Sequence, residues 1–249
     1  MFKFFRSIRQ GLVNEGKTSK YLKYALGEFI LVVLGILVAL QINNWNERRK
    51  GEEQRLVLIA NLKADMQENL GFVQQMIKRG EESKESLATF LKSARGDSSQ
   101  VPVNELGALL ELGSRPFRFE LNLPSYEVAV STGSLGLIES TELNKYFIQL
   151  RQTDAQLKRI TDLTNEVFLT GSQVELHKEL GSRQILYPQR QSGYEQFRIT
   201  EDEYREFIAR KDVYATYEQM ERFVGIKLGR MKDMKEIMTQ VLETLESLN

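Results

Sequence analysis

Glu28 is the ionisable residue of this sequence with the most suggestive position, because it lies in a long apolar segment. Residues 24–42 read YALGEFILVVLGILVALQI, and no side chain from Phe29 to Leu40 is polar. A carboxylate in such a segment can pair with a neighbouring subunit or carry protons in an assembly. Since Glu28 is close to the start of the segment, it can also reach toward the lipid headgroups beside Lys23. The sequence leaves both interpretations open.

Residue types that commonly bind metals or act as nucleophiles are scarce. The chain has no cysteine and one histidine, His177, which excludes disulfides, cysteine nucleophiles and most zinc sites. We expect His177 at the surface near the end of a helix. Residues 131–136, STGSLG, place glycines near hydroxyl groups but lack the Gly-Lys-Ser/Thr element of a phosphate-binding loop. We therefore expect a turn there, no catalytic, cofactor-binding or metal-binding residues, and a protein that is not an enzyme.

The charge balance gives no sign of a nucleic-acid partner. Lysine plus arginine and aspartate plus glutamate number 34 each, so the formal net charge is zero. A nucleic-acid-binding domain usually carries a clear basic excess. The partner that the sequence indicates is instead a lipid bilayer.

Residues 24–42 are long and apolar enough to form a transmembrane helix. Nineteen helical residues span roughly 28 Å, close to the ~30 Å thickness of the hydrocarbon core. Twelve of them are leucine, isoleucine, valine or phenylalanine, which together favour insertion by roughly 4 to 7 kcal/mol. A charged residue at the membrane centre opposes insertion by about 2.5 to 3.5 kcal/mol, and less near an interface, where Glu28 lies. Insertion is therefore predicted.

The sequence after the apolar segment argues against two other interpretations of it. A cleaved signal peptide would end in a small-x-small site, whereas this chain continues QINNWNERRK. Trp45 in that stretch is typical of the aromatic belt at the end of a retained span. A buried core helix would not be flanked by basic residues on both sides.

The basic residues around the span predict its orientation. Six precede it and four follow it, which favours a cytoplasmic N-terminus and a periplasmic C-terminal domain at a bacterial inner membrane. These are Lys3, Arg6, Arg9, Lys17, Lys20 and Lys23 before it, and Arg48, Arg49, Lys50 and Arg55 after it. Residues 1–23 also form a basic amphipathic segment, which either lies on an anionic leaflet or only sets the topology.

Small residues on one face of the span suggest a contact with another helix. Gly35 and Ala39 are four residues apart, and Gly27 lies two turns earlier on roughly the same face. Such a face allows close helix approach. We expect a homo-oligomer or a membrane-protein partner, with Glu28, Gly35, Ala39 and Trp45 as the candidate residues at the membrane or the helix contact.

The N-terminal sequence resembles a known family. The stretch GEFILVVLGILVALQINNWNE, within residues 1–50, is similar to the opening of a family of uncharacterised bacterial membrane proteins, the domain of unknown function family 6090. A weaker similarity covers residues 126–138. The resemblance implies a membrane-anchored helical protein and supplies no catalytic residues.

Residues 43–249 are expected to form an extramembrane helical domain. Two stripes with heptad-like spacing predict long helices that could pair antiparallel and close a bundle. The first stripe is Ile59, Leu62, Met66, Asn69, Val73, Met76, Leu87, Phe90 and Ala94, and the second is Val213, Tyr217, Met220, Val224, Lys227, Met231, Met234, Met238, Val241, Leu245 and Leu248. Lys227 is the only charged member of the second stripe.

Shorter elements are expected between the two stripes. We predict a short helix over 103–112, a brief extended piece in the proline-containing stretch after it, and a helix from Pro124 that Asn122 caps. A long helix follows over 141–180. Thr200 and Glu203 then have the spacing of a capping box.

The sequence thus predicts an all-α protein with one N-terminal transmembrane helix followed by an extramembrane helical bundle with long heptad-patterned helices. The function we expect is a membrane-anchored interaction, sensory or scaffold module without catalytic activity and without cofactors. The alternative is an accessory subunit of a membrane transporter or channel that uses Glu28 at a helix–helix contact. An enzyme acting near the membrane is a third hypothesis, which would require converging carboxylates in a concave site.

Overall fold

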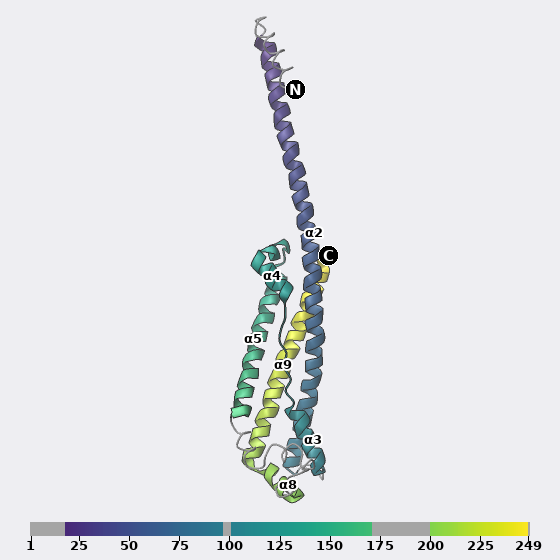
Figure 1. Cartoon of the computed structure of the whole chain (residues 1–249), viewed down its shortest axis with the longest axis vertical. Coiled ribbons are helices and arrows are strands. Elements are labelled where there is room, and N and C mark those ends of the chain that lie inside the picture. Colours follow the sequence, from purple (N-terminus) through teal and green to yellow (C-terminus); the bar gives the residue numbers. More distant parts are fainter. Residues whose placement is uncertain (1–17, 97–100, 171–199, 249) are drawn as a thin grey trace, which may run out of the picture. The chain divides into compact units, whose positions relative to one another are not determined.

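The all-α fold class is confirmed by the computed structural model, which describes residues 18–96, 101–170 and 200–248. These residues form α-helices and one 3-10 helix, with no strand among them. In chain order the elements are α2 (Thr18–Ala94), α3 (Val103–Ser114), α4 (Pro124–Thr132), η1 (Ser134–Leu137, the 3-10 helix), α5 (Thr141–Thr170), α8 (Glu201–Ala209) and α9 (Lys211–Ser247) (Figure 1). His177 and the basic segment up to residue 17 lie outside the described residues.

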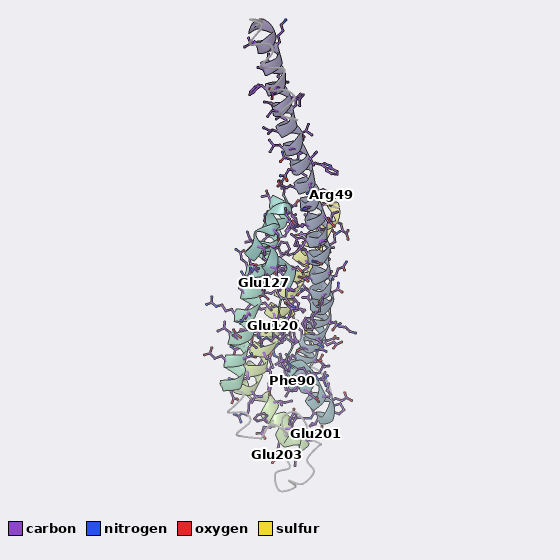
Figure 2. All side chains as sticks on the ribbon, turned by 45° about the horizontal axis from the view of Figure 1, so that its top comes forward. Arg49, Phe90, Glu120, Glu127, Glu201 and Glu203 are labelled. Atoms are coloured by element: carbon purple, nitrogen blue, oxygen red, sulfur yellow. The ribbon has the colours of Figure 1, made fainter. Side chains whose placement is uncertain are left out.

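The chain divides into two compact units, Met1–Val57 and Leu58–Asn249. The described part of the first unit is a single helix, the N-terminal part of α2, and Figure 2 shows side chains on every side of this helix up to Arg49. The second unit holds the rest of α2 together with all the other described elements. It is a helical bundle with its own hydrophobic core.

Helices α2 and α9 pack antiparallel in this bundle. The Phe90 and Tyr217 rings meet edge to face with their centroids 5.3 Å apart. Nearer the start of α2, the Glu81 carboxylate lies 2.7 Å from the Lys232 ammonium of α9. Residue numbers therefore rise along one helix as they fall along the other, which is the pairing that the two stripes predict.

The third long helix, α5, packs along α9 (Figure 1). The chain reaches the start of α5 through the extended segment 115–123, called the strap below, which follows α3 and leads into α4. Nine extended residues cover about 30 Å, a distance for which a helix needs about twenty residues. The strap thus occupies the place that a fourth long helix has in an up-and-down four-helix bundle.

Both predicted stripes form the core of the bundle. Every apolar member of the first stripe is buried, and the second stripe is buried at all but two positions, Met220 and Leu248, which are partly buried and pack against the core. The two polar members, Asn69 and Lys227, are buried as well, at 5 % and 6 % exposure. Apolar periodicity therefore predicted the core correctly. The burial of two polar side chains within the stripes is not explained by that periodicity.

The predicted capping box at the start of α8 is confirmed. The Glu203 backbone N–H donates to the Thr200 hydroxyl at 3.2 Å, and the Thr200 backbone N–H donates to the Glu203 carboxylate at 2.6 Å. Because the charged carboxylate is stabilised by these hydrogen bonds, the pKa of Glu203 is lowered. Two orphan donors at the helix end are satisfied in this way.

The helix expected from Pro124 is present, but its predicted cap is wrong. The residue before the helix is Leu123, whose side chain has no capping group. The cap comes from another helix, because the Asp65 carboxylate of α2 accepts a hydrogen bond from the Ser125 backbone N–H at 2.8 Å. Asp65 lies 60 residues before Ser125, so the local sequence around Asn122 does not indicate this capping partner.

The close approach of α3 to α2 predicts a sharp difference between two glycine substitutions. A Cβ atom at Gly113 would lie 2.6 Å from Leu87 Cγ, whereas a Cβ at Gly229 in α9 would meet nothing within 4 Å. We expect Gly113→Ala to destabilise the bundle by about 1–3 kcal/mol through overpacking. Gly229→Ala should stabilise it by about 0.5–1 kcal/mol through helix propensity. Denaturant unfolding of the full chain in detergent, followed by circular dichroism, measures both, and equal effects would contradict the close contact between Gly113 and Leu87.

Candidate functional site

Residues 25–42 lie at the start of the one described helix that is long and apolar enough to cross a membrane. Its most apolar window has a mean hydropathy of 2.4, and none of that window is buried. Leu31 is 71 % exposed and Phe29 is 66 % exposed. A helix of this length with large apolar side chains on every side exposes a large apolar surface, and contact of that surface with water is unfavourable.

The four candidate residues predicted from sequence all lie on this helix. Trp45 is 64 % exposed and lies near Arg49, whose guanidinium carbon is 5.6 Å from the centre of the indole ring. Gly35 has open space where a Cβ would stand, and Ala39, one turn further on, is exposed. Glu28 is partly exposed. The structure brings Trp45 and Arg49 together, while the roles of Glu28, Gly35 and Ala39 stay predictions.

The hydroxyl-rich stretch at 131–136 is a turn between helices, as predicted. Gly133 ends α4 with a φ of 75°, a left-handed conformation that favours glycine. The Thr132 hydroxyl donates to the Val128 carbonyl at 2.8 Å and lies 2.9 Å from the Ser134 hydroxyl. These hydroxyls are engaged in local hydrogen bonds, and the segment closes one helix in the manner of a C-terminal cap.

The strap alternates inward-facing and exposed side chains like a strand. Phe117, Phe119 and Leu123 are each 5 % exposed and Leu121 is partly buried, whereas Arg118, Glu120 and Asn122 between them are exposed. A strand in a sheet satisfies its backbone groups with a neighbouring strand. The strap lies among helices instead, so its backbone groups require side-chain partners.

Asn69 of α2 supplies two of these partners. Its side-chain nitrogen donates to the Asn122 carbonyl at 2.6 Å, and its side-chain oxygen accepts from the Asn122 backbone N–H at 3.0 Å. The amide of Asn69 thus imitates the edge of a neighbouring strand. This pairing explains why a polar residue interrupts the first apolar stripe.

Lys227 of α9 holds the strap near its start, at Phe117. Its ammonium nitrogen donates to the Phe117 carbonyl at 2.9 Å and lies 4.3 Å from the centre of the Phe117 ring. Desolvation of the buried amine lowers the pKa of Lys227 from 10.5 to about 8. The second interruption of an apolar stripe therefore has the same cause as the first, namely a backbone group of the strap.

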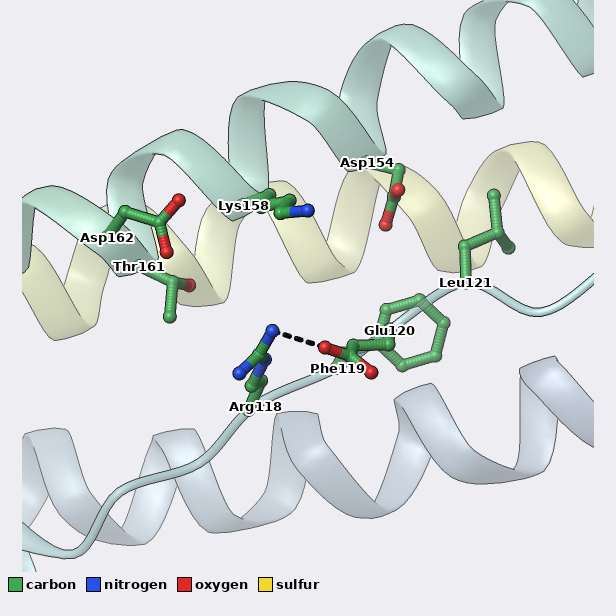
Figure 3. Close-up of a pocket in the computed structure, with 8 residues that line it drawn as sticks. All are labelled: Arg118, Phe119, Glu120, Leu121, Asp154, Lys158, Thr161 and Asp162. Atoms are coloured by element: carbon green, nitrogen blue, oxygen red, sulfur yellow. Dashed lines mark ion pairs between the residues drawn. The ribbon is translucent and has the colours of Figure 1, made fainter.

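A cavity of about 260 Å³ lies between the strap and α5 (Figure 3). Its wall carries charges of both signs, which were not predicted as a site because exposed charges on a helix usually mark a solvated face. Asp154, Lys158 and Asp162 are spaced four residues apart, and this spacing was the feature of the sequence that could have indicated a shared charged face. The lining residues are Arg118, Phe119, Glu120, Leu121, Asp154, Lys158, Thr161 and Asp162.

Within the described ranges no three histidine, aspartate or glutamate side chains come together as a possible metal site. His177 lies outside those ranges. The buried Asn69 and Lys227 side chains bind the backbone of the strap, and the buried Ser83 hydroxyl donates to the Gly113 carbonyl of α3.

Over the part of the chain that the structure describes, these features define a class of protein: an all-α fold with one apolar N-terminal helix able to span a membrane and a helical bundle that contains an extended strap. The chain belongs to a family of unknown function (DUF6090), whose sequence model matches residues 28–153, about half of its length. The matched region runs from Glu28 through the strap and α4 into α5. No curated protein and no solved structure matches the chain.

The burial of Lys227 predicts how the stability of the bundle depends on pH. Between about pH 8 and 10.5 the unfolded chain holds a proton on this amine that the folded chain has lost, so the free energy of unfolding rises with pH. Lys227→Met should remove about 2 kcal/mol of that rise between pH 7 and 9.5. Denaturant titrations at several pH values measure it.

Lys232→Met is the matched control for this experiment, because Lys232 is exposed and pairs with Glu81 at the surface. It should keep the wild-type rise. If the free energy of unfolding depends on pH in the same way for wild type and Lys227→Met, folding does not change proton binding at this amine, which would contradict the prediction.

Proposed function

We propose that this protein is a membrane-anchored helical interaction module without catalytic activity that associates with copies of itself. The observation that carries the proposal is the exposed apolar helix at the N-terminus, with no part of its apolar window buried. Insertion of that segment is favoured by roughly 4 to 7 kcal/mol from its twelve large apolar residues. Lipid is the environment in which these side chains are satisfied.

A structural role for the bundle is supported by the way its buried polar side chains are used. The Ser83 hydroxyl donates to the Gly113 carbonyl, and Asn69 and Lys227 hold the strap. Each of these groups is engaged with the backbone of its own bundle. Such hydrogen bonds make the bundle rigid, which suits a domain that presents a surface to a partner better than one that carries out chemistry in its interior.

We further propose that the anchor lies in a bacterial inner membrane, with the N-terminus in the cytoplasm and the bundle in the periplasm. The excess of basic residues before the span supports this direction. The exposed Trp45 and the nearby Arg49 suit the headgroup region at the other end of the span.

Self-association can be tested by cysteine cross-linking, because the natural chain has no cysteine. Ala39→Cys lies on the face with Gly35, and Leu37→Cys, two residues earlier, lies about 200° around the helix. In oxidised membranes we expect a disulfide-linked dimer for Ala39→Cys and at least about tenfold less for Leu37→Cys. Absence of a dimer at both positions would contradict self-association through the span.

The accessory-subunit alternative makes a different prediction in the same membranes. Disulfide cross-links from Ala39→Cys would then run to a cysteine of another polypeptide, and Glu28→Gln would abolish them, because the carboxylate would be part of the contact. In the self-associating module, Glu28→Gln leaves the Ala39→Cys dimer in place.

Orientation is tested with two further single cysteines, Ser7→Cys and Ser247→Cys. In spheroplasts, a membrane-impermeant maleimide should label Ser247→Cys and leave Ser7→Cys unlabelled until the membrane is lysed. The reverse pattern would mean that the bundle is cytoplasmic. Recovery of the chain in the soluble fraction after detergent-free lysis would overturn the anchor itself.

A further inference from the structure

The cavity between the strap and α5 is a feature that the proposed anchoring and self-association do not use. It lies wholly within the second unit, and the matched family region contributes its strap wall. Its volume of about 260 Å³ is just below the range of about 300–1,000 Å³ that is typical of small-molecule sites. A ligand of this cavity must be small.

Apolar groups of the strap line one part of the cavity. Phe119 is 5 % exposed and its ring lies against that of Phe72, with the centroids 5.7 Å apart. Leu121 is partly buried beside it. These side chains offer an apolar surface for a short aliphatic group.

Opposite the strap, α5 presents a repeating set of charges to the cavity. Asp154, Lys158 and Asp162 are four residues apart and so share one face of the helix (Figure 3). The strap adds one charge of each sign, the Arg118 guanidinium and the Glu120 carboxylate, which form an ion pair. Both walls thus carry both signs of charge around one small space.

Asp154 is the most sheltered carboxylate of the set. Its side chain is half-buried, and desolvation raises its pKa, against the opposing effects of a hydrogen bond from the Leu121 backbone N–H and of the Lys158 charge. A desolvated carboxylate gains from a cationic partner. The nearby Lys158 ammonium provides a second, positively charged position in the cavity, which can bind an anionic group.

We propose that this cavity binds a small zwitterion of the free α-amino acid class. The ammonium group of the ligand pairs with Asp154, its carboxylate pairs with Lys158 and Arg118, and its aliphatic side chain lies on Phe119 and Leu121. This assignment does not depend on the membrane anchor or on self-association.

The distribution of charge distinguishes a zwitterion from ligands of a single charge. A simple amine would meet Asp154 but would leave Lys158 unpaired near its apolar end. A simple carboxylate would face Asp154 and Asp162 without compensation. A ligand with an ammonium and a carboxylate on the same carbon atom complements both signs of the wall in a space of this size.

Three ligands of nearly the same shape test the proposal. L-leucine carries both charges, isopentylamine carries only the ammonium and 4-methylpentanoate carries only the carboxylate. Calorimetric titration of the full chain in detergent should show saturable one-to-one binding of L-leucine at millimolar concentration. Each single-charge analogue should bind at least about tenfold more weakly, since each loses one charge-assisted contact.

Two variants locate the binding. Asp154→Asn and Lys158→Gln should each weaken L-leucine binding about tenfold or more, while Lys145→Gln, an exposed lysine of α5 outside the cavity, should leave it unchanged. Circular dichroism shows whether each variant is folded. Because Asp154 also holds the strap backbone, the exposed Lys158 keeps the test decisive if Asp154→Asn does not fold.

Several results would overturn the proposal. Equal binding of isopentylamine and L-leucine would make the cavity a site for cations, and no binding of L-leucine, L-alanine or L-glutamine at millimolar concentration would remove the amino-acid site altogether. Binding that survives Lys158→Gln would place the ligand elsewhere. None of these results bears on membrane insertion, which the maleimide labelling tests separately.

Discussion

The bundle depends on one constraint: an extended segment among helices has no strand beside it to satisfy its backbone. The strap meets this constraint with polar side chains from each of the long helices. Asn69 of α2 pairs with both backbone groups of Asn122, Lys227 of α9 binds the Phe117 carbonyl, and Asp154 of α5 accepts the Leu121 N–H. The bundle thereby tolerates an amide and an amine within two long apolar stripes. Burial of the Lys227 amine costs on the order of 3 kcal/mol, and its hydrogen bond to a carbonyl that would otherwise be unpaired offsets part of that cost.

Periodicity in the sequence was sufficient to predict the helices and the core. The apolar stripes of α2 and α9 are long, and their spacing of three and four residues has one structural meaning, so their burial and their antiparallel pairing followed from the sequence. The capping box at Thr200 was equally clear, because both of its partners lie within one turn. Such a short-range interaction can be predicted from the sequence because both of its partners are close together in the chain.

Interactions between distant residues were not predictable in this way. Asp65 caps α4 in place of the expected Asn122, and the charges of α5 face a cavity whose other wall is the strap. Nothing in the local sequence of Asp154 or Lys158 identifies that wall. The polar exceptions in the stripes, Asn69 and Lys227, were visible in the sequence, but their partners became evident only from the structure. A polar residue in a long apolar stripe is therefore a useful sign that an irregular segment crosses that face.

The strap also has a consequence for the order in which the bundle assembles. Its anchors join residues 53 and 110 positions apart, from Asn69 to Asn122 and from Lys227 to Phe117. Closing loops of that length costs chain entropy before any contact repays it. We expect the strap to dock only after α2 and α9 have paired, because each of these helices supplies one of the side chains that bind its backbone. Its docking should be a late folding step, and partial opening of the native protein should begin with its release.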